Sequence, residues 1–364
     1  MTDAEVIDVS TEDQSAVALT GYGRYVPSET VTGAEIAEQS GIPEEVVVEK
    51  MGLREKRVCP PDADHASDMC VNAGREALDD ADLDATDLDL VLYHGSEYKD
   101  YVVWSAAAAI SERLGAENAY ATESYTLCAG APIAFRQVRA QLLAGDVERA
   151  LLVSASREED LVDYGNEDSS FMFNFGSGAS AAVLERAGSG AGGDGPRATV
   201  EDDARAYVRG SDALTDGSFS EDVIMPAGGS RNPPSAETVD AGLHTLDVPD
   251  HESMKERLAE VSLDNFLSVA DGALDRSGYA REDVDFVALT HMKRSFHEFL
   301  LEELSVGPEG GYYLDEYGHV QSVDQVLALD EGLRLGRVES GDVVLFLAAG
   351  TGYTWAATVL DWVG

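Results

Sequence analysis

Two stretches of the chain follow the same plan, 196 residues apart (283 − 87). In the first, Asp87-Leu88-Asp89-Leu90 opens an apolar run, and a helical pattern later leads to Gly145-Asp146-Val147. In the second, Asp283-Val284-Asp285-Phe286 opens a similar run, and Gly341-Asp342-Val343 follows. The two markers are 59 residues apart in each stretch (146 − 87 and 342 − 283). An internal repeat of this size in a chain of 364 residues predicts a duplicated α/β half.

Strand and helix patterns alternate along both stretches. Helices are expected over residues 66–80, 104–114, 131–143, 262–277, 295–305 and 322–335. Strands are expected over residues 87–94, 119–126, 149–155, 179–185, 284–290, 343–348 and 354–361, after a β-like run that begins at residue 16. Nearly continuous apolar strands indicate sheets that helices cover on both faces. Two such halves, stacked, predict a five-layered α/β/α/β/α body.

The patterns divide the chain into four parts. We expect a disordered acidic leader (residues 1–15), a first half (16–190), a linker with an irregular insertion (191–250) and a second half (251–364). The leader has no apolar core, so it is read as neither a signal peptide nor a transit peptide. The glycine-rich stretch 187–195 is typical of a linker.

The net charge of −44 is the extreme feature of the composition. The carboxylates are spread along the chain, which argues against an acidic tail for a basic partner and against nucleic acid as a ligand. Their mutual repulsion weakens when the Debye length falls to about 3 Å at 1 M salt. The composition therefore indicates a cytoplasmic protein of a salt-loving organism, for example a haloarchaeon. The apolar runs are far shorter than the ~20 residues of a membrane-spanning helix, so we expect no membrane segment.

The three cysteines are Cys59, Cys70 and Cys128. An odd number without a CxxC pair favours free thiols in a reducing compartment, and the spacings support no metal site. Cys128 lies between a predicted strand and the start of a helix, where unpaired N–H groups and the helix dipole favour a thiolate nucleophile. A buried structural thiol remains the alternative for Cys128.

Two histidines lie at comparable places in the second half. His291 ends a predicted strand, and His319 precedes a predicted helix at what we take to be the counterpart of Cys128. Each could be a satisfied core residue, but three reactive side chains at equivalent ends of a repeated unit predict a catalytic set. The turn Ala349-Gly350-Thr351-Gly352 offers backbone N–H groups for an oxyanion. It is not a GxGxxG motif, so no dinucleotide cofactor is expected.

Around these positions the sequence resembles the thiolase superfamily, most closely the 3-oxoacyl-acyl-carrier-protein synthase III group, over residues 16 to 364. The resemblance is carried by seven segments: Met51-Gly52-Leu53-Arg54-Glu55-Lys56-Arg57, Leu127-Cys128-Ala129-Gly130, Phe175-Gly176-Ser177-Gly178-Ala179, Thr215-Asp216-Gly217-Ser218, Gly228-Gly229-Ser230-Arg231, Glu316-Tyr317-Gly318-His319 and Gly350-Thr351-Gly352-Tyr353-Thr354-Trp355.

This resemblance implies a decarboxylative Claisen condensation in a homodimer. Cys128 would take an acyl group from a thioester, with the N–H groups of Cys128 and Gly352 as the oxyanion hole. A malonyl thioester would lose CO₂, and neutral imidazoles of His291 and His319 would donate hydrogen bonds to the enolate oxygen. Coenzyme A or acyl-carrier-protein thioesters would be the substrates, and no further cofactor is implied.

The sequence departs from the family pattern near the implied carrier site. His319 replaces the usual Asn, His291-Met292-Lys293-Arg294 replaces His-Gln-Ala-Asn, and Val46 and Lys50 stand where the family has Trp and Arg. The carrier is therefore left open between coenzyme A and acyl carrier protein. The candidate cations for its phosphates are Lys50, Arg54, Lys56, Arg57, Arg231, Lys293 and Arg294.

Two alternatives stay open. His94-Gly95-Ser96-Glu97-Tyr98 resembles the Glu-bearing loop of 3-hydroxy-3-methylglutaryl-CoA synthases, which condense without decarboxylation, and Glu97 would then be the general base. A solvated loop carboxylate is the other interpretation of Glu97. The second alternative is an acyltransferase that forms no carbon–carbon bond, or a scaffold without activity.

Overall fold

The structure is a computed structural model that describes residues 16–187 and 203–364. The predicted leader (1–15) and most of the glycine-rich linker lie outside these residues. None of the helices in the described ranges is long and apolar enough to cross a membrane.

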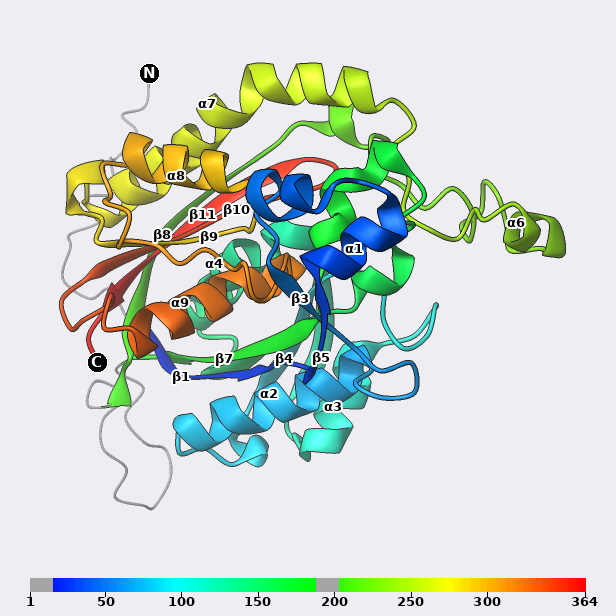
Figure 1. The fold of residues 1–364 in the computed structure, drawn as a ribbon. Coiled ribbons are helices and arrows are strands. Elements are labelled where there is room, and N and C mark those ends of the chain that lie inside the picture. The colour runs from blue at the N-terminus through cyan, green and yellow to red at the C-terminus, as the bar shows by residue number, and fades with distance from the viewer. Residues whose placement is uncertain (1–15, 188–202) are drawn as a thin grey trace, which may run out of the picture.

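One nine-stranded mixed sheet runs through the molecule. Its order is β5 (Tyr120–Tyr125), β4 (Leu90–Gly95), β6 (Arg149–Ser156), β7 (Gly178–Arg186), β1 (Val17–Tyr25), β8 (Ala206–Thr215), β11 (Thr354–Trp362), β10 (Val343–Gly350) and β9 (Phe286–Leu289). At the centre, β1 and β8 pair only at Ala18–Tyr207 and Leu19–Ala206. The sheet therefore divides there into two halves, which diverge on either side of the middle helices (Figure 1).

Helices form three layers around these two halves (Figure 1). On the outside, α2 (Ala66–Asp80) and α3 (Ala106–Leu114) pack on the first half, and α7 (His251–Ser277) and α8 (Arg294–Glu303) pack on the second. Between the halves, α4 (Gly130–Ala144) and α9 (Asp324–Arg334) contact strands of both. The predicted five-layered α/β/α/β/α fold is confirmed.

Smaller elements complete the fold. A two-stranded sheet of β2 (Glu29–Thr32) and β3 (Glu55–Val58) flanks α1 (Gly33–Ser40), and α6 (Ala236–Asp240) lies on an arm that projects from the body (Figure 1). Short 3-10 turns lie at Ala85–Asp87, Leu127–Ala129 (η3), Glu158–Leu161 (η4), Glu167–Asn174, Gly217–Phe219, Arg281–Asp283 and Gln321–Val323 (η8), and a π turn lies at Val46–Lys50.

Local patterns predicted most element positions. The helix expected over 66–80 is α2 with the same bounds, and Asp68 accepts a hydrogen bond from the backbone N–H of His65 at its start. The helix expected from residue 262 begins earlier, at His251, where Asp250 accepts from Ser253 N. Its first turns are only partly buried, and Met254, Leu258 and Val261 are the apolar side chains that pack on the core there, so the apolar pattern is sparse.

The expectation of irregular structure was wrong for residues 206–215. They form β8, which joins the two halves of the sheet by pairing with β1 and along β11. The segment includes Gly210 and Asp212 and is only partly buried, so it lacks the continuous apolar run of the other strands. The segment 206–215 is therefore a strand because β1 and β11 pair with it, and not because of a strand pattern in its own residues.

The two halves repeat one structural plan, but the segments Gly145-Asp146-Val147 and Gly341-Asp342-Val343 do not occupy equivalent positions in it. Asp89 accepts from Arg149 N, 60 residues on, whereas Asp285 accepts from Val343 N, 58 residues on. Both aspartates thus fasten the start of the neighbouring parallel strand. The equal spacing of the Gly-Asp-Val segments therefore does not align structurally equivalent residues.

Candidate active site

The candidate nucleophile Cys128 lies in η3, the tight turn between β5 and α4. Leu127 adopts a left-handed backbone (φ 49°) to form this turn, and the Cys128 side chain is buried. Gly350, at the start of the β10–β11 turn, packs against the backbone of η3. A Cβ atom on Gly350 would lie 2.5 Å from Thr126 O and 3.1 Å from Cys128 N. Only glycine fits at position 350 without moving the nucleophile turn.

His319 is held beside Cys128 by its own backbone. Its N–H donates to Asn174 O (2.7 Å), its C=O accepts from Gly176 N (2.9 Å), and its ring lies edge-on to Phe175. The ring Nε2 is 3.1 Å from Cys128 Sγ. A fixed backbone and a fixed ring place an imidazole nitrogen within hydrogen-bonding reach of the thiol.

Asp324, the first residue of α9, connects the two histidines. Its Oδ2 is 2.6 Å from His319 Nδ1 and accepts from the backbone N–H of His291 (2.7 Å), while Oδ1 accepts from Val320 N (2.7 Å). Burial lowers the pKa of His319, but the Asp324 carboxylate and the Cys128 sulfur outweigh it and hold that pKa well above its usual value. These contacts favour a protonated His319, contrary to the neutral ring we expected.

His291 follows β9 and is buried next to the Tyr313 ring, with 4.7 Å between the ring centroids. Tyr313 is fixed by a hydrogen bond from its hydroxyl to Met292 O (2.8 Å). Burial, then the charge of His319, holds the pKa of His291 well below its usual range. Among the described residues neither ring nitrogen has a hydrogen-bond partner. A neutral imidazole with unused nitrogens is available to a ligand.

The structural counterpart of Cys128 is Ser322, not His319 as we expected. In η8, Gln321 adopts the same left-handed backbone (φ 56°) that Leu127 adopts in η3, and both turns precede a middle helix. Ser322 Oγ bonds Ser154 Oγ (2.5 Å). Gln321 Oε1 accepts from the Cys128 thiol at 2.9 Å, so the two equivalent turns meet at the candidate site.

Other predicted site residues lie less centrally. Gly352 (φ 101°) is in the turn between β10 and β11, two residues after Gly350. Glu97 is exposed, and among the described residues no hydrogen bond or ion pair links it to the Cys128–histidine cluster. Cys59 and Cys70 are buried, and burial raises the pKa of both thiols, to about 12 for Cys59. No group of three potential metal ligands occurs in the described ranges.

The candidate cations differ in accessibility. Arg54 pairs with Glu316 and Arg57 with Glu55, while Lys50 and Lys293 are exposed. Arg231, 90% exposed, pairs with Glu221 in the segment before α6. The expectation for Lys56 was wrong, because it is fully buried and donates to Phe175 O (2.6 Å), out of reach of a carrier.

Arg294 borders a cleft of 810 Å³ beside the site. Its guanidinium lies 4.0 Å from the centre of the Tyr313 ring and pairs with Asp315. Tyr313 and Arg337 also line this cleft. Since Tyr313 packs on His291, the cleft adjoins the candidate active site.

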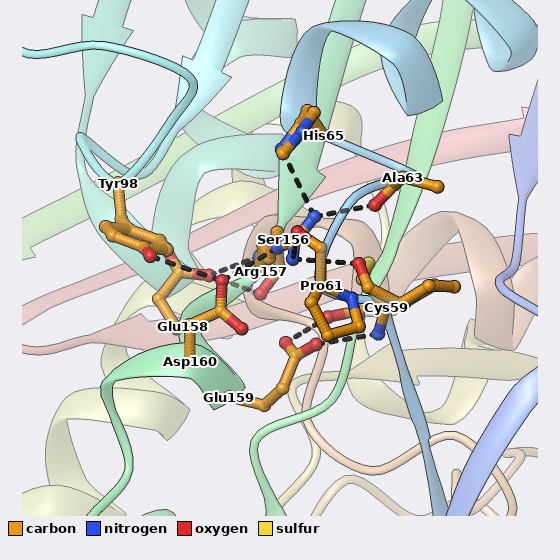
Figure 2. A network of polar contacts seen from close by, with 12 residues as sticks. Cys59, Pro61, Ala63, His65, Tyr98, Ser156, Arg157, Glu158, Glu159 and Asp160 are labelled. Carbon is orange, nitrogen blue, oxygen red and sulfur yellow. Dashed lines mark hydrogen bonds and ion pairs between the residues drawn. The ribbon is translucent and has the colours of Figure 1, made fainter.

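A polar network around Arg157 braces the first half (Figure 2). Arg157 pairs with Asp160 and donates to the carbonyls of Pro60, Pro61 and Ala63. Next to it, Glu159 accepts from Cys59 N (Figure 2), and it also accepts from the Ser177 hydroxyl. These hydrogen bonds tie residues 59–63 to the η4 turn.

Family comparisons agree with these features. The family model "3-Oxoacyl-[acyl-carrier-protein (ACP)] synthase III" matches residues 123–196, and the C-terminal model of the same family matches residues 274–362. A protein of Caldanaerobacter subterraneus subsp. tengcongensis named beta-ketoacyl-[acyl-carrier-protein] synthase III is 29% identical, over 96% of this chain and 99% of the relative. A protein of the same name from Desulfitobacterium hafniense (strain Y51) is 28% identical, over 95% and 98%.

Solved structures show the same fold. 3-Oxoacyl-[acyl-carrier-protein] synthase III from Aquifex aeolicus superposes with a TM-score of 0.78 at 21% identity, over 95% of this chain and 100% of that one. The priming β-ketosynthase of the R1128 polyketide pathway gives 0.78 at 24%, over 96% and 97%. Xanthomonas campestris OleA, solved with lauric acid and lauroyl-CoA, gives 0.78 at 18%, over 96% and 100%.

The fold and the family matches define an acyltransferase of the thiolase superfamily. Within that class, the chain is similar over most of its length to 3-oxoacyl-acyl-carrier-protein synthase III enzymes.

Proposed function

We propose that the enzyme condenses an acyl thioester with a malonyl thioester, with loss of CO₂, to give a 3-oxoacyl thioester. The observation that carries this proposal is the buried cluster of Cys128, His319 and His291. It combines a sulfur nucleophile, an imidazole in contact with it and a second imidazole with unused nitrogens. The named activity of the relatives supports the same reaction.

The cluster serves both steps of the reaction. Cys128 attacks the acyl thioester and carries the acyl group. The backbone N–H groups of Cys128 and Gly352 stabilise the tetrahedral oxyanion. When the malonyl group loses CO₂, His291 and His319 donate hydrogen bonds to the enolate oxygen, and the carbanion attacks acyl-Cys128. No metal or redox cofactor takes part in this scheme.

The substrates are carried on coenzyme A or on the phosphopantetheine of an acyl carrier protein. Their phosphates need cations at the entrance, and Arg294 is the best placed because it lines the cleft beside Tyr313. Further candidates are Lys50, Arg54, Arg57, Lys293 and Arg231. We expect Arg294→Ala to raise KM for the carrier thioester more than kcat falls. Arg276→Ala on α7 is the control, and equal KM values in both variants would exclude Arg294.

The decisive experiment identifies the product. The enzyme is loaded with acetyl thioester at high salt and then given malonyl-CoA, malonyl-acyl-carrier protein or acetoacetyl-CoA separately. Acetoacetyl product with release of CO₂ supports the proposal, and Cys128→Ala should lower the rate at least ~10³-fold while the protein stays folded. A hydroxymethylglutaryl product from acetoacetyl-CoA would instead favour the alternative with Glu97 as base. A stable acetyl adduct with no product from any extender would favour an acyltransferase without condensation.

A homodimer in a salt-rich cytoplasm is part of the proposal. The loop after β4 exposes Tyr101, Val102 (89%) and Val103 (105%), beside the sheet edge formed by β5. Exposed apolar side chains next to an unpaired edge favour contact with a second copy. Sedimentation at 2 M KCl should show a dimer, and Val102→Asp should weaken it. A monomer at micromolar concentration would exclude this assembly.

A further inference from the structure

Three buried side chains form a continuous line from the start of α9 to the candidate nucleophile. Asp324 Oδ2 lies 2.6 Å from His319 Nδ1, and His319 Nε2 lies 3.1 Å from Cys128 Sγ. None of the three is more than 5% exposed. This is the order of contacts found in carboxylate–histidine–nucleophile triads.

The carboxylate determines which nitrogen of His319 carries the proton. Asp324 cannot turn away, because its two oxygens also accept the backbone N–H groups of His291 and Val320. A ring nitrogen facing a carboxylate carries a proton, so Nδ1–H points at Asp324. Nε2, which faces Cys128, is then a bare lone pair in the neutral ring. It becomes a donor only when the ring is protonated.

The surroundings of His319 favour that second proton. Cys128 faces the ring from η3 and Asp324 faces it from α9, and both are anionic when ionised. The neutral Gln321 amide faces Cys128 from η8 at 2.9 Å, and the thiolate gives up the hydrogen bond that the thiol donates there. His291, which adjoins from the end of β9, is neutral because burial holds its pKa well below the usual range. Lys56 packs behind Gly318 from β3, and burial lowers its pKa to about 7, against the attraction of Glu159. At neutral pH Lys56 is therefore only partly charged, and the Asp324 carboxylate at Nδ1 is the charge in direct contact with the ring.

We propose that Asp324 is a positioning residue that stores Cys128 as a thiolate beside a protonated His319. The second part of the inference rests on the proposed function: the same imidazolium donates the hydrogen bond to the enolate oxygen. An asparagine amide at position 319 would donate at every pH. A histidine whose Nδ1 is occupied by Asp324 donates from Nε2 only while it is charged.

The proton balance of the cycle closes with His319 protonated throughout. The Cys128 thiolate forms a bond to the acyl carbon, and the carrier sulfur leaves with its electron pair and takes a proton from solvent. The malonyl carboxylate then leaves as CO₂, and its bonding pair forms the enolate. As the new carbon–carbon bond forms, the bond between the acyl carbon and Cys128 breaks and the thiolate returns. No step needs a proton from or to His319.

The test measures the thiolate directly. Iodoacetamide alkylation of Cys128 is followed by intact mass between pH 5 and 10 at 2 M KCl, with Cys128→Ala as the background for Cys59 and Cys70. For Asp324→Asn we expect the half-maximal pH to rise by at least about one unit, and alkylation at pH 7 to slow about tenfold. Asp285→Asn is the matched control, because this carboxylate accepts the Val343 N–H at the start of β10, and its profile should equal that of the wild type.

A folded Asp324→Asn protein with the wild-type profile would overturn the inference, since a purely structural carboxylate would not shift the thiol. If this variant does not fold, His319→Gln leaves Asp324 and its backbone bonds in place. It should show the same upward shift, and an unchanged profile would equally overturn the inference. Alkylation needs no acyl substrate or extender. A missing condensation product with a shifted profile would therefore defeat the proposed function and leave the thiolate pair standing.

Discussion

At the scale of single residues, Lys56 is a buried ionisable group close to the candidate site. Lys56 is enclosed behind the His319 loop, with its ammonium on Phe175 O and with Glu159 as the nearby opposite charge. Burial lowers the pKa of Lys56 to about 7, far below the usual value for lysine. Such a lysine makes the stability of the fold depend on pH, separately from catalysis.

The sign of that dependence follows from the proton count. Between pH 7 and about 10 the unfolded chain keeps the Lys56 proton that the folded protein has lost. This group therefore adds stability as the pH rises through that window, by at most about 1.4 kcal/mol per unit. We expect Lys56→Met to remove this slope from urea unfolding curves. Lys255→Met, an exposed lysine on α7, should keep the slope, and parallel curves for Lys56→Met and wild type would contradict the expectation.

At the scale of elements, the site depends on turns that press on one another. The turn η3 carries Cys128, η8 lies opposite it, and the β10–β11 connection closes over it at Gly350. The side-chain contacts of Cys128 with Gln321 and His319 join segments more than 190 residues apart. The catalytic geometry therefore depends on how closely the two halves pack.

Gly350→Ala tests that packing. Its Cβ atom would lie 2.5 Å from Thr126 O and 2.9 Å from Ala129 N, so the nucleophile turn must shift. We expect a loss of activity of about 10²-fold, as for a displacement of about 1 Å, and a loss of stability of about 1–3 kcal/mol. Gly217→Ala is the control, since a Cβ atom there meets nothing within 4 Å. Full activity in the Gly350 variant would contradict this view of the turn.

At the scale of the whole molecule, charge dominates. The chain has 69 Asp and Glu residues against 25 Lys and Arg, so repulsion destabilises the compact state in dilute buffer. Raising KCl from 0.1 to 1 M shortens the Debye length from about 10 to about 3 Å. We expect Tm to rise by about 5 °C or more over this range, since a few kcal/mol shift the Tm of a protein this large by that amount.

Differential scanning calorimetry in a KCl series would measure the shift. Sucrose at matched osmolality is the control, because it strengthens burial without screening charge. An equal rise in sucrose, or no rise in KCl, would contradict electrostatic repulsion as the cause.

Local sequence determined the architecture and the candidate nucleophile. The alternation of strand and helix patterns predicted five layers, and the position of Cys128 before a helix singled it out, because periodicity and helix starts are properties of neighbouring residues. His291 could likewise be predicted as a polar residue at the end of a buried strand.

Only the tertiary structure decided the rest. Asp324 gave no sequence signal beyond its place five residues after His319, and its contacts with His291 and His319 depend on where α9 enters the body. The strand β8 exists because β1 and β11 pair with it, and Lys56 was mistaken for a surface cation because its burial comes from segments distant in sequence. The structural counterpart of Cys128 is Ser322 rather than His319, because the backbone conformation of the turn, and not the reactivity of the side chain, defines equivalent positions. A local sequence pattern cannot show which ionisable groups from distant segments come into contact. The packing of the two halves around one site decides this.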